Sequence, residues 1–543
     1  MPTNPTFGKE NGKISTKTQA RAKRVAMRRA SLWLGLCLLG CDAEPQVTDS
    51  ASDEVRNPRA LSPVADSAAV AMPTAVGLSP ERAQHASPHL PAHDSKVSPG
   101  GPAPSDAPRV YAKSRNVWVR SGPSSELQWL GMLWFGGSVQ VRSSERVSGH
   151  GCGGSWVPVE PRGWVCVDTQ RATLDANDPT YRALLPFRAR VETPTPHRYA
   201  WINRDIRRFE SLAHAEPFLK AWGTRKGGTF GHPAPTLPEL PSGLSERRDH
   251  IYARSAFAYA ADGDYLETGL LLGADLSWVA RSDVELLPEV TFQGVQLGGE
   301  LQLPLAFFKS DDAAVYERRS AEEFVRSTSP SPPRLSHQRL EGPPVTVGKA
   351  SYYQLHGNEL WVRRGEVVVI DPREPFPREF SSASSEPQRN DSKSVRPPTW
   401  IEISILGGWL LAYEGAHPVY ATLISAGRGG LPVPGKELIS TASTPTGRFF
   451  VTGKFKTATM ESSSGPIVHG DVPWTQNFSG PHAIHGAYWH DEWGKLKSAG
   501  CVNVSPRDGQ WLFEFTEPRV PEGWHGVRHH SRYGEATLVV LHD

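Results

Sequence analysis

The sequence lacks an excess of either charge, and this limits the partners that it favours. Lysine and arginine together number 59, aspartate and glutamate 57, and the formal net charge is +2. A protein that binds nucleic acid usually carries a basic surface with interleaved aromatic residues, and no segment of this chain has that character. We therefore expect no nucleic acid partner.

Long apolar runs are also missing from the N-terminal segment. The run at residues 32–39 is too short to span a bilayer as a mature helix. A basic segment with Arg21, Lys23, Arg24, Arg28 and Arg29 precedes it, which predicts an export signal over residues 1–41. The run ends in Leu38-Leu39-Gly40-Cys41, which resembles the bacterial lipobox. That resemblance implies a lipid on Cys41 and an exported lipoprotein, anchored to a membrane of the cell envelope or periplasm. The alternative is a plain secretory signal with an incidental cysteine.

Cysteine is scarce, and the five present fall into separate groups. Cys37 and Cys41 belong to the signal segment. Cys152 and Cys166 lie close together in a β-rich segment, and outside the cytoplasm such a pair favours a disulfide. Cys501 is left over. A leftover cysteine in an exported protein is an accident, a bridge to a second chain or a reactive thiol, and its surroundings favour the reactive thiol.

Glycine and proline are abundant, with 50 and 48 residues, which favours strands, turns and linkers over long helices. Residues 42–108 are rich in Ala, Pro, Ser and Asp, and we expect a disordered tether there. Residues 109–173 alternate polar and apolar side chains, which predicts a small β-barrel. Residues 119–124 and 163–165 resemble bacterial SH3-like domains. That resemblance implies a unit that binds wall peptides or packs against a catalytic domain, and a spacer without a ligand is the alternative.

The middle region, residues 174–380, is expected to be β-rich. Residues 276–281 and 359–364 share the pattern around Trp164, which predicts further barrel-like, SH3-like repeats at residues 252–287 and 349–371. The Ser/Pro-rich stretch at residues 381–398 is typical of a linker and marks a domain boundary.

The last domain, residues 399–543, has a mostly β pattern with short helices. Alternating apolar residues at 400–405 and 409–413, with Gly407-Gly408 between them, predict a hairpin. Further strands are expected at residues 418–426, 447–451 and 537–541. Ser505-Pro506-Arg507-Asp508 has the composition of a helix start, and it predicts a helix from Pro506 to about Thr516.

Cys501 and His485 carry the candidate chemistry of this domain. An ordinary thiol has a pKa near 8.5, so it is only about a few per cent thiolate at neutral pH and needs a neighbouring base. His485 can take the proton and then stand beside the sulfur as imidazolium. Gly500 lets a substrate approach the backbone, and its amide is a candidate donor to an oxyanion, as is the Ser498 hydroxyl.

Four ordered motifs resemble the L,D-transpeptidase (YkuD) catalytic domain. They are residues 409–414, residues 444–449, Ala483-Ile484-His485-Gly486 and Ser498-Ala499-Gly500-Cys501-Val502-Asn503. The resemblance implies a β-sandwich-like fold in which Cys501 is the nucleophile and His485 the base. It also implies that the carbonyl of Gly486 orients the histidine, and that Asn503 holds the substrate or braces the loop.

The same resemblance implies an acyltransferase that cross-links peptidoglycan stem peptides, or attaches a protein to them, in cell wall biogenesis. If water reached the thioester first, the site would act as an L,D-carboxypeptidase. Many relatives carry His or Arg where this chain has Ala499. The non-enzymatic alternative is therefore a wall-binding lipoprotein with weak or no turnover.

Four histidines, His469, His482, His485 and His490, lie close in sequence and raise a zinc site as an alternative. Their spacing matches no metal motif and no second thiol is near, so we expect no metal and no other cofactor. A sortase-type enzyme also uses Cys and His, but it relies on an Arg that this motif does not supply. The aromatic residues Tyr488, Trp489 and Trp493 are expected either to form a lid or to cover the core.

Overall fold

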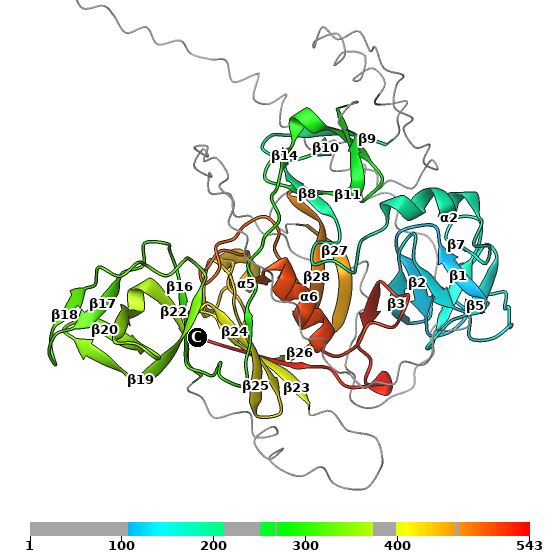
Figure 1. The fold of residues 1–543 in the computed structure, drawn as a ribbon. Coiled ribbons are helices and arrows are strands. Elements are labelled where there is room, and N and C mark those ends of the chain that lie inside the picture. Colours follow the sequence, from blue (N-terminus) through cyan, green and yellow to red (C-terminus); the bar gives the residue numbers. More distant parts are fainter. Residues whose placement is uncertain (1–106, 211–214, 216–249, 266–268, 373–397, 462–465) are drawn as a thin grey trace, which may run out of the picture. The chain divides into compact units, whose positions relative to one another are not determined.

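The computed structural model describes residues 107–210, 215, 250–265, 269–372, 398–461 and 466–543 (Figure 1). The expected signal segment with Cys41, residues 42–106 of the tether and most of the expected linker lie outside the described residues. Strands dominate the described part and its helices are few and short, so the fold is mainly β, as the sequence predicted. No described helix has the length and apolar character that a bilayer crossing requires.

The region after residue 108 is built from short strands of alternating burial. These are β1 (Arg109–Ala112), β2 (Val117–Arg120), β3 (Trp129–Leu133), β4 (Ser138–Gln140), β5 (Ser155–Pro158), β6 (Trp164–Val167) and β7 (Ala172–Thr173). β1 pairs with β4 and β7, whereas β2 pairs with β3 and β6. The inward side chains, such as Val119, Leu133 and Val165, form one apolar cluster. The period of two in the sequence therefore corresponds to one buried face.

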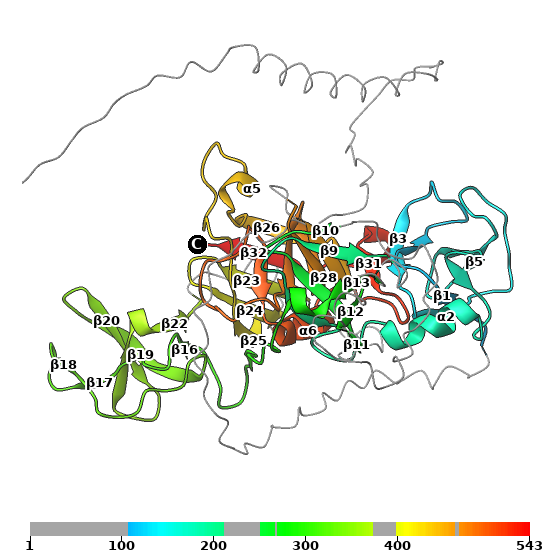
Figure 2. The ribbon, with the colours of Figure 1, turned by 90° about the horizontal axis from the view of Figure 1, so that it is seen from above.

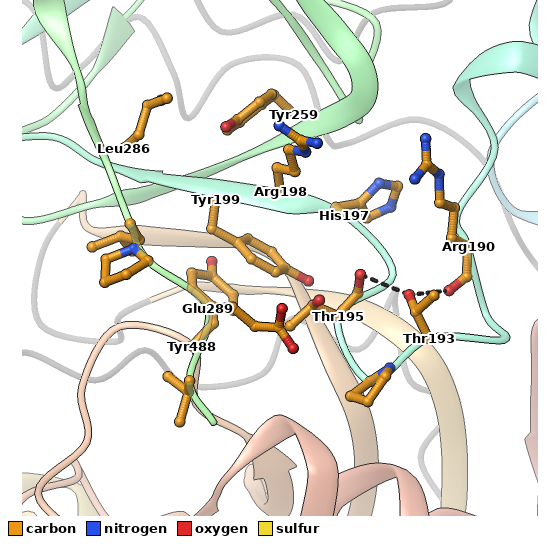
Figure 3. Close-up of a pocket in the computed structure, with 14 residues that line it drawn as sticks. Arg190, Thr193, Thr195, His197, Arg198, Tyr199, Tyr259, Leu286, Glu289 and Tyr488 are labelled. Atoms are coloured by element: carbon orange, nitrogen blue, oxygen red, sulfur yellow. Dashed lines mark hydrogen bonds between the residues drawn. The ribbon is translucent and has the colours of Figure 1, made fainter. Parts of the chain in front are cut away.

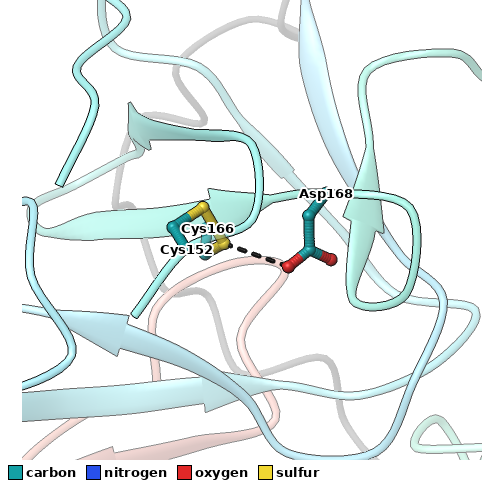
Figure 4. Close-up of side chains that lie close together, drawn as sticks. All are labelled: Cys152, Cys166 and Asp168. Carbon is teal, nitrogen blue, oxygen red and sulfur yellow. Dashed lines mark hydrogen bonds between the residues drawn. A yellow bond between two sulfur atoms is a disulfide. The ribbon is translucent and has the colours of Figure 1, made fainter. Parts of the chain in front are cut away.

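Cys152 and Cys166 form a disulfide beside Asp168 (Figure 4). Their Cα atoms lie 5.6 Å apart and the two residues are separated by 14 positions. A disulfide that closes a loop of this size stabilises the folded state by about 3 kcal/mol, because it limits the conformations of the unfolded chain. The bond therefore ties the segment just before β5 to β6.

The next region continues in strands after one short helical segment. Its elements are α2 (Pro179–Leu184), η1 (Leu185–Phe187), β8 (Arg198–Trp201), β9 (Ile206–Phe209), β10 (His250–Ile251), β11 (Ala256–Tyr265), β12 (Leu270–Gly273), β13 (Trp278–Ala280), η2 (Arg281–Asp283), β14 (Glu285–Leu286) and β15 (Val295–Gln296). β13 pairs with β12 and β9, and β8 pairs with β11 and β14. Residues 252–287 are thus mostly β, but their sheet also includes β8 and β9.

A seven-stranded sheet follows, and its strands lie together in Figure 2. It consists of β16 (Leu305–Phe308), β17 (Val315–Arg318), β18 (Phe324–Arg326), β19 (His337–Val347), β20 (Ala350–Leu355), β21 (Leu360–Arg363), η3 (Arg364–Glu366) and β22 (Val367–Ile370). The sequence located only residues 349–371 of this unit. Trp278 and Trp361 each lie in a strand that leads into a 3-10 turn, η2 or η3, and then into another strand. The two segments therefore share local structure, while their SH3-like character stays a prediction.

The C-terminal region is a sandwich of two sheets. One sheet holds β15, β23 (Thr399–Ser404), β24 (Trp409–Glu414), β25 (His417–Leu423), β26 (Gly447–Phe450) and β32 (Leu538–His542). The other includes β27 (Gly453–Glu461), β28 (Val468–Ser479), β29 (His482–Gly486), β30 (Val502–Val504) and β31 (Gly526–Arg528). Ile401 and Leu410 of the first sheet pack with Ile484 and Val502 of the second in one buried cluster. The predicted hairpin is present as β23 and β24, with Ile401 opposite Ala412.

Three short helical segments complete this region: α5 (Leu438–Thr441), α6 (Pro506–Phe515) and η4 (Ser531–Tyr533). α6 begins where predicted and contacts β28 and β29 (Figure 1). The Ser505 side chain accepts a hydrogen bond from the backbone N–H of Asp508, which caps the helix. The Asp508 carboxylate in turn accepts from Tyr420 and Thr422 of β25, at 2.6 and 2.7 Å. α6 is thereby attached to both sheets, immediately after β30.

β31 joins this region to the N-terminal strands. It pairs with β27 on one side and with β3 on the other, where Gly131 lies opposite Val527. Trp524, just before β31, is 1% exposed and belongs to the same apolar cluster as Val119. The segments that the sequence separates at residue 173 and residue 399 are therefore hydrogen-bonded through one sheet.

Candidate active site

Two neighbouring parallel strands place His485 beside Asn503, and Cys501 lies just before the second of these strands. β29 pairs with β30 so that His485 lies opposite Asn503. Side chains of paired residues lie on the same face of a sheet, so His485 and Asn503 share a face, and Cys501 immediately precedes β30, two residues before Asn503. Both reactive side chains are buried, with 1% of His485 and 4% of Cys501 exposed. Cys501 is a thiol outside the disulfide, and its Sγ lies 3.9 Å from the carbonyl oxygen of Pro481.

Both ring nitrogens of His485 have polar neighbours. Nδ1 lies 3.5 Å from the carbonyl oxygen of Gly486, a long hydrogen bond that matches the orienting role expected for that residue. Nε2 lies 3.0 Å from the side-chain nitrogen of Asn503. Burial lowers the pKa of His485 to about 3, so the ring is neutral at physiological pH and can accept a proton.

His490 belongs to the same arrangement, which the sequence did not predict. It is buried, and its Nε2 lies 3.2 Å from Oδ1 of Asn503. Burial lowers its pKa to about 4. Asn503 thus lies between two histidines and contacts both. The sequence indicated only that His485 and His490 lie close together along the chain, and this proximity was considered as part of a possible zinc site.

Residues 498–501 form a tight loop whose polar groups bond to one another. The Ser498 hydroxyl donates to the carbonyl oxygen of Cys501 at 2.5 Å, and the Gly500 amide donates to the Ser498 oxygen at 3.0 Å. These two groups were expected to hold an oxyanion. Both donors are engaged within the loop that carries the thiol, and their role toward an oxyanion stays a prediction.

Gly500 is required by its backbone conformation and by its neighbours. Its φ is +131°, a value that side-chain-bearing residues rarely adopt. A Cβ at this position would lie 3.0 Å from Nε2 of His482 and 3.0 Å from the carbonyl oxygen of Ser443. The glycine therefore permits the turn that places Cys501 at the start of β30.

The turn at residues 444–447 supports the same loop. The Thr444 hydroxyl donates to the carbonyl oxygen of Gly500 at 2.9 Å and accepts from the amide of Gly427 at 2.8 Å. The backbone of Asn503 is also held in place, since its N–H and carbonyl form two 2.9 Å hydrogen bonds with the backbone of Ser425. The motifs that are far apart in the sequence therefore meet around one loop.

The aromatic residues between the two strands cover the core. Tyr488, Trp489 and Trp493 are all buried and belong to one large apolar cluster. The Tyr488 ring stacks on Tyr199 with centroids 3.5 Å apart, and its hydroxyl donates to the carbonyl oxygen of Gly470. The Trp489 ring centroid lies 5.7 Å from that of His485. Of the two expectations for these residues, packing against the core is the one observed.

A cavity of about 530 Å³ is lined in part by Tyr488 (Figure 3). Its lining is mixed, with apolar side chains and a few charged ones, among them Arg198 and Glu289. His197 also lines it, and burial lowers the pKa of that imidazole to about 4. Neither His485 nor Cys501 contributes to this lining.

A buried ion pair stabilises β28, the strand that precedes β29. Arg115, from the turn between β1 and β2, contacts Asp471 at 2.9 Å, and both side chains are nearly inaccessible. Burial alone would raise the pKa of Asp471, but the charge of Arg115 together with the Thr457 hydroxyl and neighbouring histidines holds it below its ordinary value. The carboxylate is therefore ionised and paired.

Comparisons with known proteins match one part of the chain. A family model for the L,D-transpeptidase catalytic domain, YkuD, matches residues 398–527. No curated protein matches the chain.

Several solved structures resemble the chain. An Enterococcus faecium L,D-transpeptidase is 21% identical over 27% of this chain and 50% of its own, with a TM-score of 0.20. The catalytic domain of an E. faecium L,D-transpeptidase is 22% identical over 26% of this chain and 96% of its own, with a TM-score of 0.19. A Stackebrandtia nassauensis L,D-transpeptidase is 18% identical over 30% and 63%, with a TM-score of 0.18. The chain thus spans about half the length of the first of these proteins.

Proposed function

We propose that this protein, whose residues 398–527 match the family model of the L,D-transpeptidase catalytic domain, joins peptidoglycan stem peptides through a Cys501 thioester. The observation that carries the proposal is the register of β29 and β30, which aligns His485 with Asn503, two residues after Cys501. A neutral imidazole beside a thiol is the pair that a cysteine acyltransferase needs. Gly486 supports the role of His485, because its carbonyl accepts from the imidazole.

The first step forms the acyl-enzyme. His485 takes the proton of the Cys501 thiol, and the thiolate attacks the carbonyl carbon that precedes the terminal D-amino acid of a donor stem. The C–N bond breaks, and the leaving amine takes the proton from the imidazolium. A shift of about two units in the thiol pKa corresponds to about 2.7 kcal/mol of differential stabilisation, which one well-placed ionic pair can supply.

The second step resolves the thioester. An amine of a second stem attacks the thioester carbonyl while His485 removes its proton, and the C–S bond breaks. The thiolate then recovers that proton from the imidazolium. A protein amine in place of the second stem would attach a protein to the wall, and water would give an L,D-carboxypeptidase. Because all three acceptors meet one thioester, the acceptor decides the product.

The test is incubation of the purified chain with disaccharide-tetrapeptides, followed by mass spectrometry. We expect cross-linked dimers, or loss of the terminal residue if water is the acceptor, and neither product with Cys501→Ala. The same product profile from wild type and Cys501→Ala would refute the proposal. Equal circular dichroism of the two proteins is the control that the variant is folded.

One observation favours a second function, a wall-binding protein with little turnover. The thiol and its base are almost completely buried, and Ala499 stands where many relatives carry His or Arg. In that case the wild-type protein and its Cys501→Ala variant would sediment equally well with isolated peptidoglycan, and neither would yield product. Sedimentation that is lost in the Cys501→Ala variant would instead indicate that binding depends on the acyl-enzyme.

We further propose that the protein is exported and anchored by a lipid on Cys41. The Cys152–Cys166 disulfide supports an oxidising compartment, since such bonds are rare in the cytoplasm. Metabolic labelling with a fatty-acid analogue tests the anchor. Label should enter the wild-type chain and be absent from Cys41→Ala, and equal labelling of the two would exclude this site.

A further inference from the structure

A chain of hydrogen bonds runs from one backbone group to another through the candidate active site. The amide of Glu492 lies 3.2 Å from Nδ1 of His490, and Nε2 of His490 lies 3.2 Å from Oδ1 of Asn503. Nδ2 of Asn503 lies 3.0 Å from Nε2 of His485, whose Nδ1 lies 3.5 Å from the carbonyl oxygen of Gly486. Three side chains from two strands and one loop are thus joined end to end between two backbone groups.

The two backbone ends fix the direction of every bond between them. A backbone N–H only donates, so Nδ1 of His490 accepts from Glu492, and the neutral ring carries its hydrogen on Nε2. His490 then donates to Oδ1 of Asn503, which leaves Nδ2 of Asn503 to donate to Nε2 of His485. At the other end the Gly486 carbonyl only accepts, so His485 carries its hydrogen on Nδ1. Both ends give the same tautomer of His485.

We propose that His490 is a positioning residue which, through Asn503, holds His485 in its neutral Nδ1–H tautomer and opposes the imidazolium in the substrate-free enzyme. The proposal rests on the proposed function only in taking Cys501 and His485 as the reacting pair. It gives Asn503 a part beyond bracing the loop, and it assigns a part to a histidine outside the proposed reacting pair.

The physical reason is a conflict between donors. A proton on Nε2 of His485 would face the N–H group of Asn503. If the Asn503 amide turned over, its oxygen would suit His485, but its nitrogen would then face the N–H group of His490. His490 cannot move its hydrogen to Nδ1, because that atom faces the amide of Glu492. A buried donor without an acceptor is unfavourable, so the whole chain favours neutral His485.

The surrounding charges do not provide another way to hold an imidazolium. Burial has the largest influence on the pKa of His485 and lowers it. The Gly486 carbonyl raises this pKa, and His490 lowers it. His469, on β28, is buried with its pKa lowered to about 3 by burial and by His485. Asp491, Glu492 and Lys497 act on His490, where the largest influence is again burial. The negative charge that would suit a protonated His485 is therefore the Cys501 thiolate itself.

The test is the pH dependence of iodoacetamide alkylation at Cys501, measured on the full chain from the mass of the peptide that contains it. Iodoacetamide reacts with the thiolate, so the midpoint of the rate profile reports how readily the thiolate–imidazolium pair forms. The assay needs no peptidoglycan. Failure of transpeptidation therefore leaves the result for His490 unaffected.

In His490→Phe the Asn503 amide is released to turn its oxygen toward His485. We expect the alkylation midpoint to move down by about one pH unit, which is about a tenfold faster reaction on the acidic side of the profile. His490→Gln is the matched control, because its amide offers an acceptor and a donor spaced much as in imidazole and should keep the wild-type profile. A wild-type or upward-shifted profile in His490→Phe, or equal shifts in both variants, overturns the proposal.

A second measurement needs no folded His490 variant. In histidine labelled with ¹⁵N, the ring nitrogens of wild-type His485 should show the hydrogen on Nδ1, and those of His490 the hydrogen on Nε2. His485→Gln identifies the first set of signals by their loss. A hydrogen on Nε2 of wild-type His485 overturns the proposal.

Discussion

In the proposed reaction, a single imidazole, that of His485, decides how readily the buried thiol reacts. His485 is neutral at physiological pH because burial lowers its pKa to about 3, and it has one ring nitrogen able to accept a proton. The sequence indicated this residue and Cys501 because each lies in a short local motif. It could not indicate the contact of Asn503 with His490, which depends on how a loop folds back on β30.

We expect His485→Gln to lower the rate of acylation by about 10²- to 10⁴-fold, the usual contribution of a general base. Gln keeps a polar side chain near Gly486 but cannot take the thiol proton. The measurement is the rate at which a carbapenem adds its mass to the intact chain. Cys501→Ala should give no adduct at all, and a His485→Gln rate equal to wild type would contradict the role of the imidazole.

At the scale of elements, the site depends on a turn that holds a loop. Thr444 bonds to Gly500 and Gly427, and thereby connects the turn before β26 to the loop before β30. The elements around the site were predicted where their signals are local: the β23–β24 hairpin by alternation, and α6 by its cap. β28 was not predicted, because it is buried almost throughout and contains Gly470 and Pro473, so its sequence shows no alternation.

Thr444→Val should destabilise the protein by about 1–3 kcal/mol, since it removes one hydroxyl and leaves two buried backbone groups without that partner. The acylation rate should fall as well, because the loop that carries Cys501 loses a support. Urea unfolding followed by tryptophan fluorescence measures the first effect. Thr444→Ser retains the hydroxyl and should lie close to wild type, so equal losses in the two variants would point to packing of the methyl group instead.

At the scale of the whole molecule, long-range pairs connect regions that the sequence treats as separate. Residues 109–173 were expected as one unit and residues 399–543 as another, yet Arg115 and Asp471 form a buried ion pair between them. No local sequence pattern predicts this ion pair, since Arg115 and Asp471 lie 356 positions apart. The ion pair is seen only in the folded structure, where residues distant in sequence come together, as β3 and β31 also do.

Arg115→Met should destabilise the chain by about 3–5 kcal/mol, because it leaves the Asp471 carboxylate buried and unpaired. Thermal unfolding measures the effect. Arg204→Met is the matched control, since Arg204 pairs with Asp283 at an exposed site and its loss should cost less than about 1 kcal/mol. Equal shifts in melting temperature for the two variants would contradict the importance of the buried pair.

The stability of the whole chain should fall as the pH falls below about 6.5. Burial lowers the pKa of His485 and His525 to about 3 and that of His490 to about 4, so the folded chain keeps these rings neutral where the unfolded chain protonates them. The unfolded state then binds more protons, and each such ring costs about 1.4 kcal/mol per pH unit between pH 6.5 and its folded pKa. Melting temperatures measured at pH 7.5, 6 and 5 should decrease in that order, and a constant melting temperature would contradict the burial of these rings.

The position of Trp524 determines when residues 109–173 can finish folding during synthesis. This indole lies in the apolar cluster of residues 109–173, its Nε1 donates to the carbonyl oxygen of Glu160 at 2.9 Å, and the β31 strand beside it pairs with β3. A ribosome releases residues 109–173 long before it reaches residue 524. Residues 109–173 must therefore wait, with part of their core open, until Trp524 and β31 have been synthesised.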